Sequence, residues 1–158
     1  MTDRILKRNL HFVAATKDTN FVSSLLSNGA DIDAKNFQGD TALIRTVKQQ
    51  LIDMTSLLLQ KGAEVNARNF AGDTALSIAA QGETTDILDV LLRAEADVNT
   101  TDTEGNTPLM NATQKQSVQH VTVLLKHGAD VNARNTQGRT ALDIASDLRN
   151  EKLILALL

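Results

Sequence analysis

Residues 61–76 read Lys-Gly-Ala-Glu-Val-Asn-Ala-Arg-Asn-Phe-Ala-Gly-Asp-Thr-Ala-Leu, and this stretch decides the fold. Close copies of it stand at 28–43 and 127–142, and a looser copy stands at 94–109. Successive copies begin 33 residues apart. A fixed period of this length indicates one supersecondary unit that recurs along the chain and packs on its neighbours.

Several single positions keep the same 33-residue step. They form a Gly column at 39, 72, 105 and 138, a Thr column at 41, 74, 107 and 140, and a Leu column at 10, 43, 76, 109 and 142. A pair of Leu residues precedes each copy of the motif, and a last pair at 157–158 ends the chain in phase. The columns predict a single domain, 1–158, of five units at about 4–36, 37–69, 70–102, 103–135 and 136–158, of which the first and last serve as caps.

The residues of one unit predict two short helices. Thr74 stands where a helix N-cap is expected, before a first helix that ends near Ala80. A second helix over about 84–93 places its apolar residues on one face at helical spacing. Thr140 and Asp143 have the spacing of a capping box. Helices this short are marginal in isolation, so each unit must bury its apolar face against its neighbours.

The segment that joins one unit to the next predicts a projecting finger. Gly29, Gly62 and Gly128 supply the left-handed residue that ends a helix. The stretch after each of them alternates and then turns at another Gly, which is typical of a β-hairpin-like finger. The fold class expected is an all-α solenoid of helix-turn-helix units with β-hairpin-like fingers along one edge.

The period, the Thr-[Pro/Ala]-Leu opening of the first helix and the Gly-Ala-Asp-Val-Asn-Ala close of the unit resemble the ankyrin repeat. The resemblance runs from about Arg4 to Leu158 and implies a solenoid that binds proteins through the concave face made by its fingers and first helices. Glu95 replaces the helix-ending Gly in the third unit, which predicts about 1 kcal/mol of backbone strain or a different turn. Most family members also turn between the two helices on Gly. In this chain the same column holds Lys17, Gln50, Glu83, Gln116 and Arg149, and the sequence leaves the geometry of these turns open.

Composition excludes several classes of protein. The formal net charge is −3, whereas nucleic-acid binders usually carry a basic face, so no nucleic-acid partner is expected. No apolar run approaches the roughly 20 residues that span a bilayer, so no membrane insertion is expected. The first residues lead into no uninterrupted apolar stretch and do not resemble a signal peptide. The absence of Cys excludes disulfides and thiolate metal sites, and it fits a cytoplasmic location.

The sequence contains neither a Gly-rich phosphate loop nor a His-Glu-x-x-His motif. We therefore expect no catalytic residue, no metal site and no cofactor, and we interpret the chain as a protein other than an enzyme. His120 lies in a column that otherwise holds apolar residues. It is expected to be a partly buried structural residue, and the alternative is a pH-sensitive or ligand-binding role. Asp31 and Asp33 mimic the start of a calcium loop, but the finger pattern explains them better because the loop's Gly and closing Glu are missing.

Finger positions that the fold itself does not require are the candidates for partner binding. They are Lys35, Phe37, Asp40, Arg68, Phe70, Asp73, Glu104, Arg134 and Arg139. Phe37 and Phe70 occupy an exposed turn position one repeat apart, so their rings should stand side by side, flanked by Lys35 and Arg68 as a binding anchor. The alternative is that each ring packs on the neighbouring finger as scaffold. The charge of the fingers also changes along the chain, since the third finger is acidic and the fourth is basic.

The leading interpretation is a protein–protein interaction module or adaptor whose partner is another protein. The alternative is a regulatory or targeting domain of a longer polypeptide or of an enzyme partner. Leu155 stands where the earlier units have Ser, Ser, Asp and Thr, which leaves the last helix apolar on a face that should be wet. Because terminal repeats normally carry polar outer faces, we expect either self-association through the C-terminal helix or a chain that continues beyond Leu158.

Overall fold

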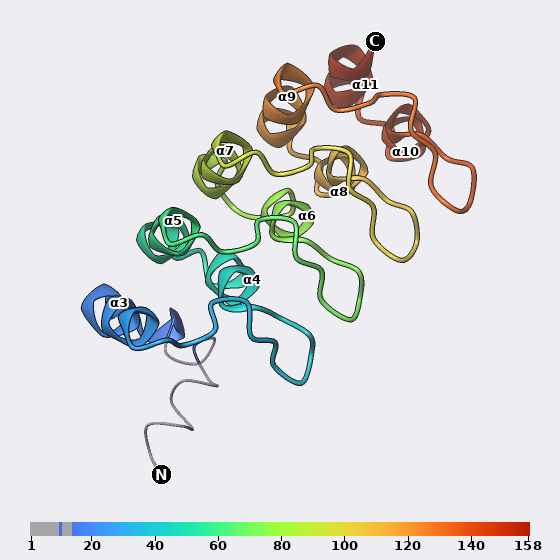
Figure 1. Ribbon diagram of the computed structural model, residues 1–158. Coiled ribbons are helices and arrows are strands. Elements are labelled where there is room, and N and C mark those ends of the chain that lie inside the picture. The colour runs from blue at the N-terminus through green and yellow to red at the C-terminus, as the bar shows by residue number, and fades with distance from the viewer. Residues whose placement is uncertain (1–9, 11–13) are drawn as a thin grey trace.

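The computed structural model describes Leu10 and residues 14–158, and the start of the first expected unit lies outside these residues. The described helices form two parallel rows, with α3, α5, α7, α9 and α11 in one row and α4, α6, α8 and α10 in the other (Figure 1). The helices α3 and α11 lie at opposite ends of the stack (Figure 1). The element bounds are η1 Ala14–Thr16, α3 Thr19–Ser27, α4 Ala42–Lys48, α5 Ile52–Gln60, α6 Ala75–Ala79, α7 Asp86–Arg93, α8 Pro108–Gln114, α9 Val118–Lys126, α10 Ala141–Asp147 and α11 Glu151–Leu157.

The four first helices that the structure describes in full, α4, α6, α8 and α10, begin at the Thr column, as expected. The hydroxyls of Thr41, Thr74, Thr107 and Thr140 accept the backbone N–H three residues on. The capping box predicted at Thr140 and Asp143 is confirmed, because the Asp143 carboxylate in turn accepts the Thr140 N–H at 2.8 Å. These hydrogen bonds from Thr140 lower the pKa of Asp143. The sequence thus places the N-termini of these four helices through local hydrogen bonds.

A continuous apolar core fills the space between the two rows. The Leu column of the first helices, apart from the half-buried Leu142, and the first Leu of the pairs in the second helices supply many of its large members. These are Leu43, Leu76, Leu109, Leu25, Leu58, Leu91 and Leu124, each no more than 5% exposed. Because neighbouring units share this core, the short helices are stabilised by stacking and not by intrinsic propensity.

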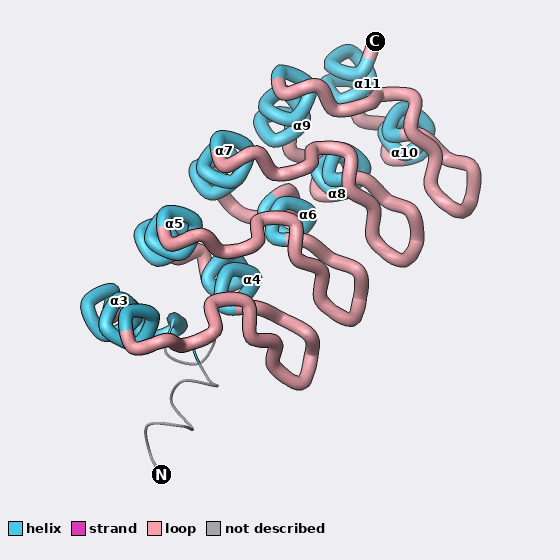
Figure 2. The backbone as a smooth tube through the Cα atoms, viewed as in Figure 1, coloured by secondary structure: helices cyan, strands magenta, loops and turns pink. Residues whose placement is uncertain are grey.

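The fingers follow a hairpin-shaped path and project from the row of first helices (Figure 2). No strand is present among the described residues, so the β-hairpin-like part of the expected fold consists of turns. In the second finger, for example, the Asn69 N–H donates to the Asp73 carbonyl, and Asn69 Oδ1 accepts the N–H groups of Ala71 and Asp73. One Asx side chain therefore closes each finger on itself.

The helix-ending turns use the left-handed backbone conformation throughout. Gly29, Gly62 and Gly128 have φ of 82°, 87° and 85°. Glu95 takes the same conformation at φ 61°, so the chain keeps the turn and accepts the strain, which decides between the two outcomes left open by the sequence.

The turns between the two helices of a unit are also left-handed, at residues that carry side chains. Lys17, Gln50, Gln116 and Arg149 have φ between 52° and 66°. Glu83, in the same column, has no positive φ. Its unit passes instead through a longer turn, and α7 begins at Asp86, two residues later than the helix expected from about residue 84.

Candidate partner-binding surface

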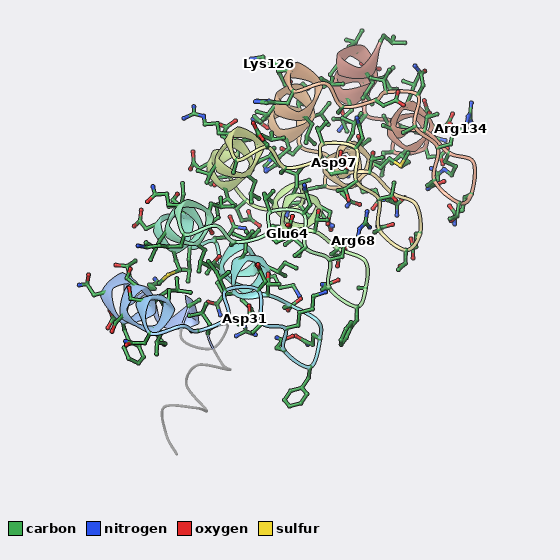
Figure 3. The ribbon with its side chains drawn as sticks, in the orientation of Figure 1. Asp31, Glu64, Arg68, Asp97, Lys126 and Arg134 are labelled. Carbon is green, nitrogen blue, oxygen red and sulfur yellow. The ribbon has the colours of Figure 1, made fainter. Side chains whose placement is uncertain are left out.

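We define the finger face as the four finger segments 35–40, 68–73, 101–106 and 134–139 together with the first helices α4, α6, α8 and α10 beside them. Figure 3 labels Arg68 on the second finger and Arg134 on the fourth. The nine candidate residues predicted from the sequence all lie in these segments. The structure divides them into side chains that reach solvent and side chains that hold the fingers together.

The two aromatic rings are exposed to different degrees. Phe37 is fully exposed (104%) and Phe70 is 72% exposed. The Phe70 ring lies against the preceding finger, since a Cβ placed on Gly39 would meet Phe70 Cδ1 at 2.7 Å. The adjacent pair of rings expected from the sequence is not formed, because a fully exposed Phe37 has no neighbour. Phe37 is free of the scaffold, whereas Phe70 packs partly on it.

Two of the candidate cations tie neighbouring fingers together. Lys35 Nζ donates to the backbone carbonyl of Arg68 at 2.8 Å. The Arg68 guanidinium donates to the carbonyls of Gly72 and Thr101, and at 2.8 Å to the hydroxyl of Thr100. Except for the bond to Gly72, which lies within the second finger, these bonds span about one repeat, so the two cations do not flank an aromatic pair as expected. Their first role is to hold the next finger.

Asp40 is a structural residue. Its side chain is completely buried, pairs with Lys48 Nζ of α4 at 2.8 Å and accepts the Asn69 side-chain amide at 3.0 Å. In the last unit the equivalent positions hold Arg139 in the finger and Asp147 in α10. These two side chains pair at 2.5 Å. An ion pair between the finger and the first helix is therefore present in both units, with the acidic and basic partners exchanged.

The remaining three candidates are more accessible. Asp73 is half-buried and makes no ion pair with any described residue. Burial raises the pKa of Asp73, a hydrogen bond from Asn69 lowers it, and nearby Asp102 raises it further. Glu104 is exposed, and Arg134 is exposed but donates to the Gly138 carbonyl at 2.6 Å.

Sequence reasoning missed the role of the Asx residue that opens each finger. The side-chain amide of Asn69 donates to Asp40 Oδ1 at 3.0 Å, and that of Asn135 donates to Asn106 Oδ1 at 2.9 Å. Asp102 occupies the same column without an amide to donate. The signal was present in the sequence, since this column reads Asn, Asn, Asp, Asn at 36, 69, 102 and 135.

A second side-chain ladder joins the bases of the fingers. Oδ1 of Asp33, Asn66 and Asn99 accepts the backbone N–H of the residue 31 positions later, which is Glu64, Asp97 and Asp130 respectively. Figure 3 shows Asp31, Glu64 and Asp97 recurring along the stack at this level. The Asp-x-Asp pattern at 31–33 thus serves the stacking of units, in agreement with the finger interpretation.

His120 joins α9 to the turn before α7 and is only 2% exposed. Its Nδ1 lies 2.6 Å from Ser117 Oγ, and its Nε2 lies 3.1 Å from the carbonyl of Thr84 in the preceding unit. Burial lowers the pKa of His120; the Thr84 bond raises it, Lys115 lowers it and Glu83 raises it. The structural interpretation of this residue accounts for both ring nitrogens.

Within Leu10 and residues 14–158, no group of three or more His, Cys, Asp and Glu side chains is arranged to hold a metal ion. In the same part of the chain, no helix has the length and apolar character needed to cross a membrane.

A family model described as ankyrin repeats (3 copies) matches residues 10–102 and matches again at residues 76–158. The two matches overlap, and together they cover the chain from residue 10 to residue 158. A search of curated proteins gives no match.

Proposed function

Because the chain belongs to the ankyrin-repeat family, whose repeats are generally protein–protein interaction modules, we propose that it binds another protein through the finger face. The observation that carries the proposal is Phe37, a fully exposed aromatic ring at a finger tip. Aromatic side chains, Phe included, are enriched in protein interfaces relative to the rest of the surface. Ankyrin repeats are typically non-catalytic, and we extend that property to this chain.

The fingers present their side chains from a bonded framework. Each finger is closed by its Asx residue, and backbone or side-chain bonds tie it to its neighbours. A surface that is ordered before binding loses little conformational entropy on association. We therefore expect each individual finger to keep its conformation when the interface forms.

The two rings make separable contributions to the proposed interface. Phe37 contacts nothing in the unbound chain, so Phe37→Ala should weaken binding without a loss of stability. Phe70 also packs on the Gly39 turn, so Phe70→Ala should weaken binding and lower the melting temperature as well. Burial of one such ring in a partner pocket contributes about 2 kcal/mol or more, which corresponds to roughly a thirtyfold loss of affinity.

The test begins with affinity capture of the partner from its source, followed by binding titration of purified variants. Leu155→Ala is the matched control, because it removes a large exposed apolar side chain from α11, away from the fingers. The proposal requires that Phe37→Ala loses affinity while Leu155→Ala keeps it, both with unchanged melting curves. Equal affinity of the two variants would place the interface elsewhere.

Charges at the last finger should act mainly on the rate of association. Arg134 is exposed, and Arg139 is partly neutralised by Asp147. We expect Arg134→Ala to slow association and to reduce its dependence on salt, with a smaller effect on the dissociation rate. Association rates measured at two ionic strengths check this, and a change confined to the dissociation rate would contradict it.

A second surface is the apolar side of α11. Leu155 is 74% exposed and Leu158 is 85% exposed. Either a second copy of the chain or a further part of a longer polypeptide would bury them, and the latter case matches the alternative of a regulatory or targeting domain. We expect this chain, on its own, to self-associate at high concentration, and Leu155→Glu to abolish it. Sedimentation that gives a monomer for both proteins would defeat the self-association.

A further inference from the structure

Three junctions between successive fingers lie within the described residues: the first between 35–40 and 68–73, the second between 68–73 and 101–106, and the third between 101–106 and 134–139. All three share the base ladder of Asp33, Asn66 and Asn99. They differ in the hydrogen bonds at the finger tips, because the second junction lacks bonds that the other two junctions have.

The first and third junctions have the same two bonds at the tip. One joins the backbones, with the Phe70 N–H on the Gln38 carbonyl at 3.1 Å and the Thr136 N–H on the Glu104 carbonyl at 3.0 Å. The other joins side chains: the amide of Asn69 donates to Asp40, and the amide of Asn135 donates to Asn106. We call this side-chain contact the rung of the junction. Each junction is thus closed by a backbone bond and a side-chain bond.

The second junction has neither bond. The Thr103 N–H, which corresponds to those of Phe70 and Thr136, makes no backbone hydrogen bond to the second finger, although 68–73 and 101–106 are all described. Asp102 accepts the N–H groups of Glu104 and Asn106 with Oδ1, so it still closes its own finger. Its Oδ2 takes the Asn106 amide at 3.3 Å, and it has no proton to give to Asp73.

At this rung a carboxylate replaces the amide donor, and like charges repel. The groups that face Asp73 are Asp102, Lys48 and Asp40. Lys48 is already paired with Asp40, so neither carboxylate of the second junction has a cation of its own. Burial of Asp73 and the charge of Asp102 both raise the pKa of Asp73. Like charge therefore disfavours the close approach of the Asp73 and Asp102 carboxylates across the second junction.

The side chain of Arg68 and the packing of Thr103 on Gly72 hold the two fingers together in place of the missing hydrogen bonds; a Cβ placed on Gly72 would meet Thr103 Cγ2 at 3.0 Å. The guanidinium of Arg68 spans the junction and bonds to the Thr101 carbonyl and the Thr100 hydroxyl. These contacts lie at the start of the third finger, before its tip. They leave residues 103–105 without a bond to the second finger.

We propose that the finger edge opens at the second junction: the tip of the third finger moves away from the second about the contacts made by Arg68, driven by the repulsion of Asp73 and Asp102. The finger face then consists of two closed junctions on either side of one adjustable junction. A partner lying across the second and third fingers would meet a gap whose width it can set.

Site-resolved hydrogen exchange of the Phe70, Thr103 and Thr136 amides tests the opening. The Thr103 N–H has no backbone acceptor among the described residues and should exchange fastest whether or not the junction opens, so the decisive result is its response to Asp102→Asn, which restores the amide donor found in the other fingers and should slow the exchange by about tenfold. Asp73→Asn removes the same repulsion from the other side and should act in the same direction. Leu58, in the buried core of α5, reports any change in global stability and should be unaffected.

The reciprocal variant moves the defect to the first junction. Asn69→Asp places a carboxylate against Asp40, and we expect the Phe70 amide to exchange faster while Thr136 stays unchanged. The proposal is overturned if Thr103 exchanges no faster than Phe70 and Thr136 in the native chain. It is also overturned if neither Asp102→Asn nor Asp73→Asn slows Thr103.

Distances between finger tips supply a second measurement. The chain has no Cys, so pairs of spin labels can be attached without removing any native residue of that type. Labels at the equivalent exposed tip positions 38 and 71, 71 and 104, and 104 and 137 report the three junctions in turn. We expect the distance distribution of the middle pair to be the broadest, and Asp102→Asn to narrow it. Three distributions of equal width would contradict the opening.

Discussion

The glycines of the finger tips and the turns between the helices use the same left-handed backbone for different reasons. In the fingers, Gly39, Gly72 and Gly105 have φ near 80°, and a Cβ at any of them would lie within 3.0 Å of the backbone nitrogen of the next finger. In the turns between the helices, at the helix ends remote from the fingers, Gln50 and Gln116 adopt a left-handed φ with their side chains in place. The free-energy cost of a left-handed backbone conformation is therefore distinct from the cost of crowding between neighbouring fingers.

Gly138 has the backbone conformation of the finger glycines without their close contact to a following finger. It has the same φ as the other finger glycines, 77°, but a Cβ there would meet nothing within 4 Å, since the structure places no further finger against it. A side chain at Gly138 therefore meets only the conformational cost, which the chain accepts at Gln50 and Gln116. A side chain at Gly39 meets both costs.

The largest expected effect comes from Gly39→Ala. Its new Cβ would lie 2.7 Å from the Phe70 nitrogen, a backbone atom that cannot move without breaking the bond to Gln38. We expect a loss of roughly 3 kcal/mol in the free energy of unfolding, against about 1 kcal/mol for Gly138→Ala. Chemical denaturation of both variants measures the difference, and equal losses would mean that the first junction adapts to the extra methyl group.

Smaller gains are expected where the chain accepts strain without crowding. Glu95→Gly and Gln116→Gly remove a left-handed non-Gly residue, but glycine also increases the entropy of the unfolded chain. The net stabilisation should be about 0.5 kcal/mol in each case, seen as a rise in melting temperature. The reciprocal control is Gly62→Glu, at a position where a Cβ has no neighbour within 4 Å, and it should lose a similar amount. A lower melting temperature for Glu95→Gly would show that the Glu95 side chain stabilises the turn.

The smallest expected effect concerns the one turn between helices that has no left-handed residue in this column. Its Thr84 carbonyl is bound by His120, whose pKa is lowered by burial. Below the ordinary value of 6.5 the unfolded chain takes up a proton that the folded His120 does not, so the free energy of unfolding falls as the pH falls. Unfolding curves between about pH 7.5 and 5.5 should show a shallower decline for His120→Leu than for the native chain. Identical slopes would mean that His120 takes up its proton equally in both states.

Local sequence signals predicted the elements that local chemistry builds. The Thr column predicted the N-caps, and Thr140 with Asp143 predicted a capping box, because the donor and acceptor lie three residues apart in the same turn. The helix-ending glycines were predicted for the same reason. The longer turn before α7 was not, because Gly82 and Glu83 offer no single favoured geometry until the units stack.

The candidate site was predicted less completely than the fold. The exposure of Phe37 followed from its place in a turn, but the positions of Lys35, Arg68 and Asp40 did not. These side chains bond to groups about 30 residues away, and the stagger of one finger against the next decides which atoms meet. Their burial and hydrogen bonds exist only after two units have packed.

The sequence by itself determined the 33-residue period, the family, the N-caps and the helix-ending glycines, because each of these depends on residues that are close along the chain. The tertiary structure alone decided that the carboxylates of Asp73 and Asp102 share a rung while the amides of Asn69 and Asn135 close theirs. The physical reason is that stacking brings equivalent columns of successive units into contact. Asp in place of Asn at position 102 keeps the hydrogen bonds that close the third finger and alters only the junction with the second finger.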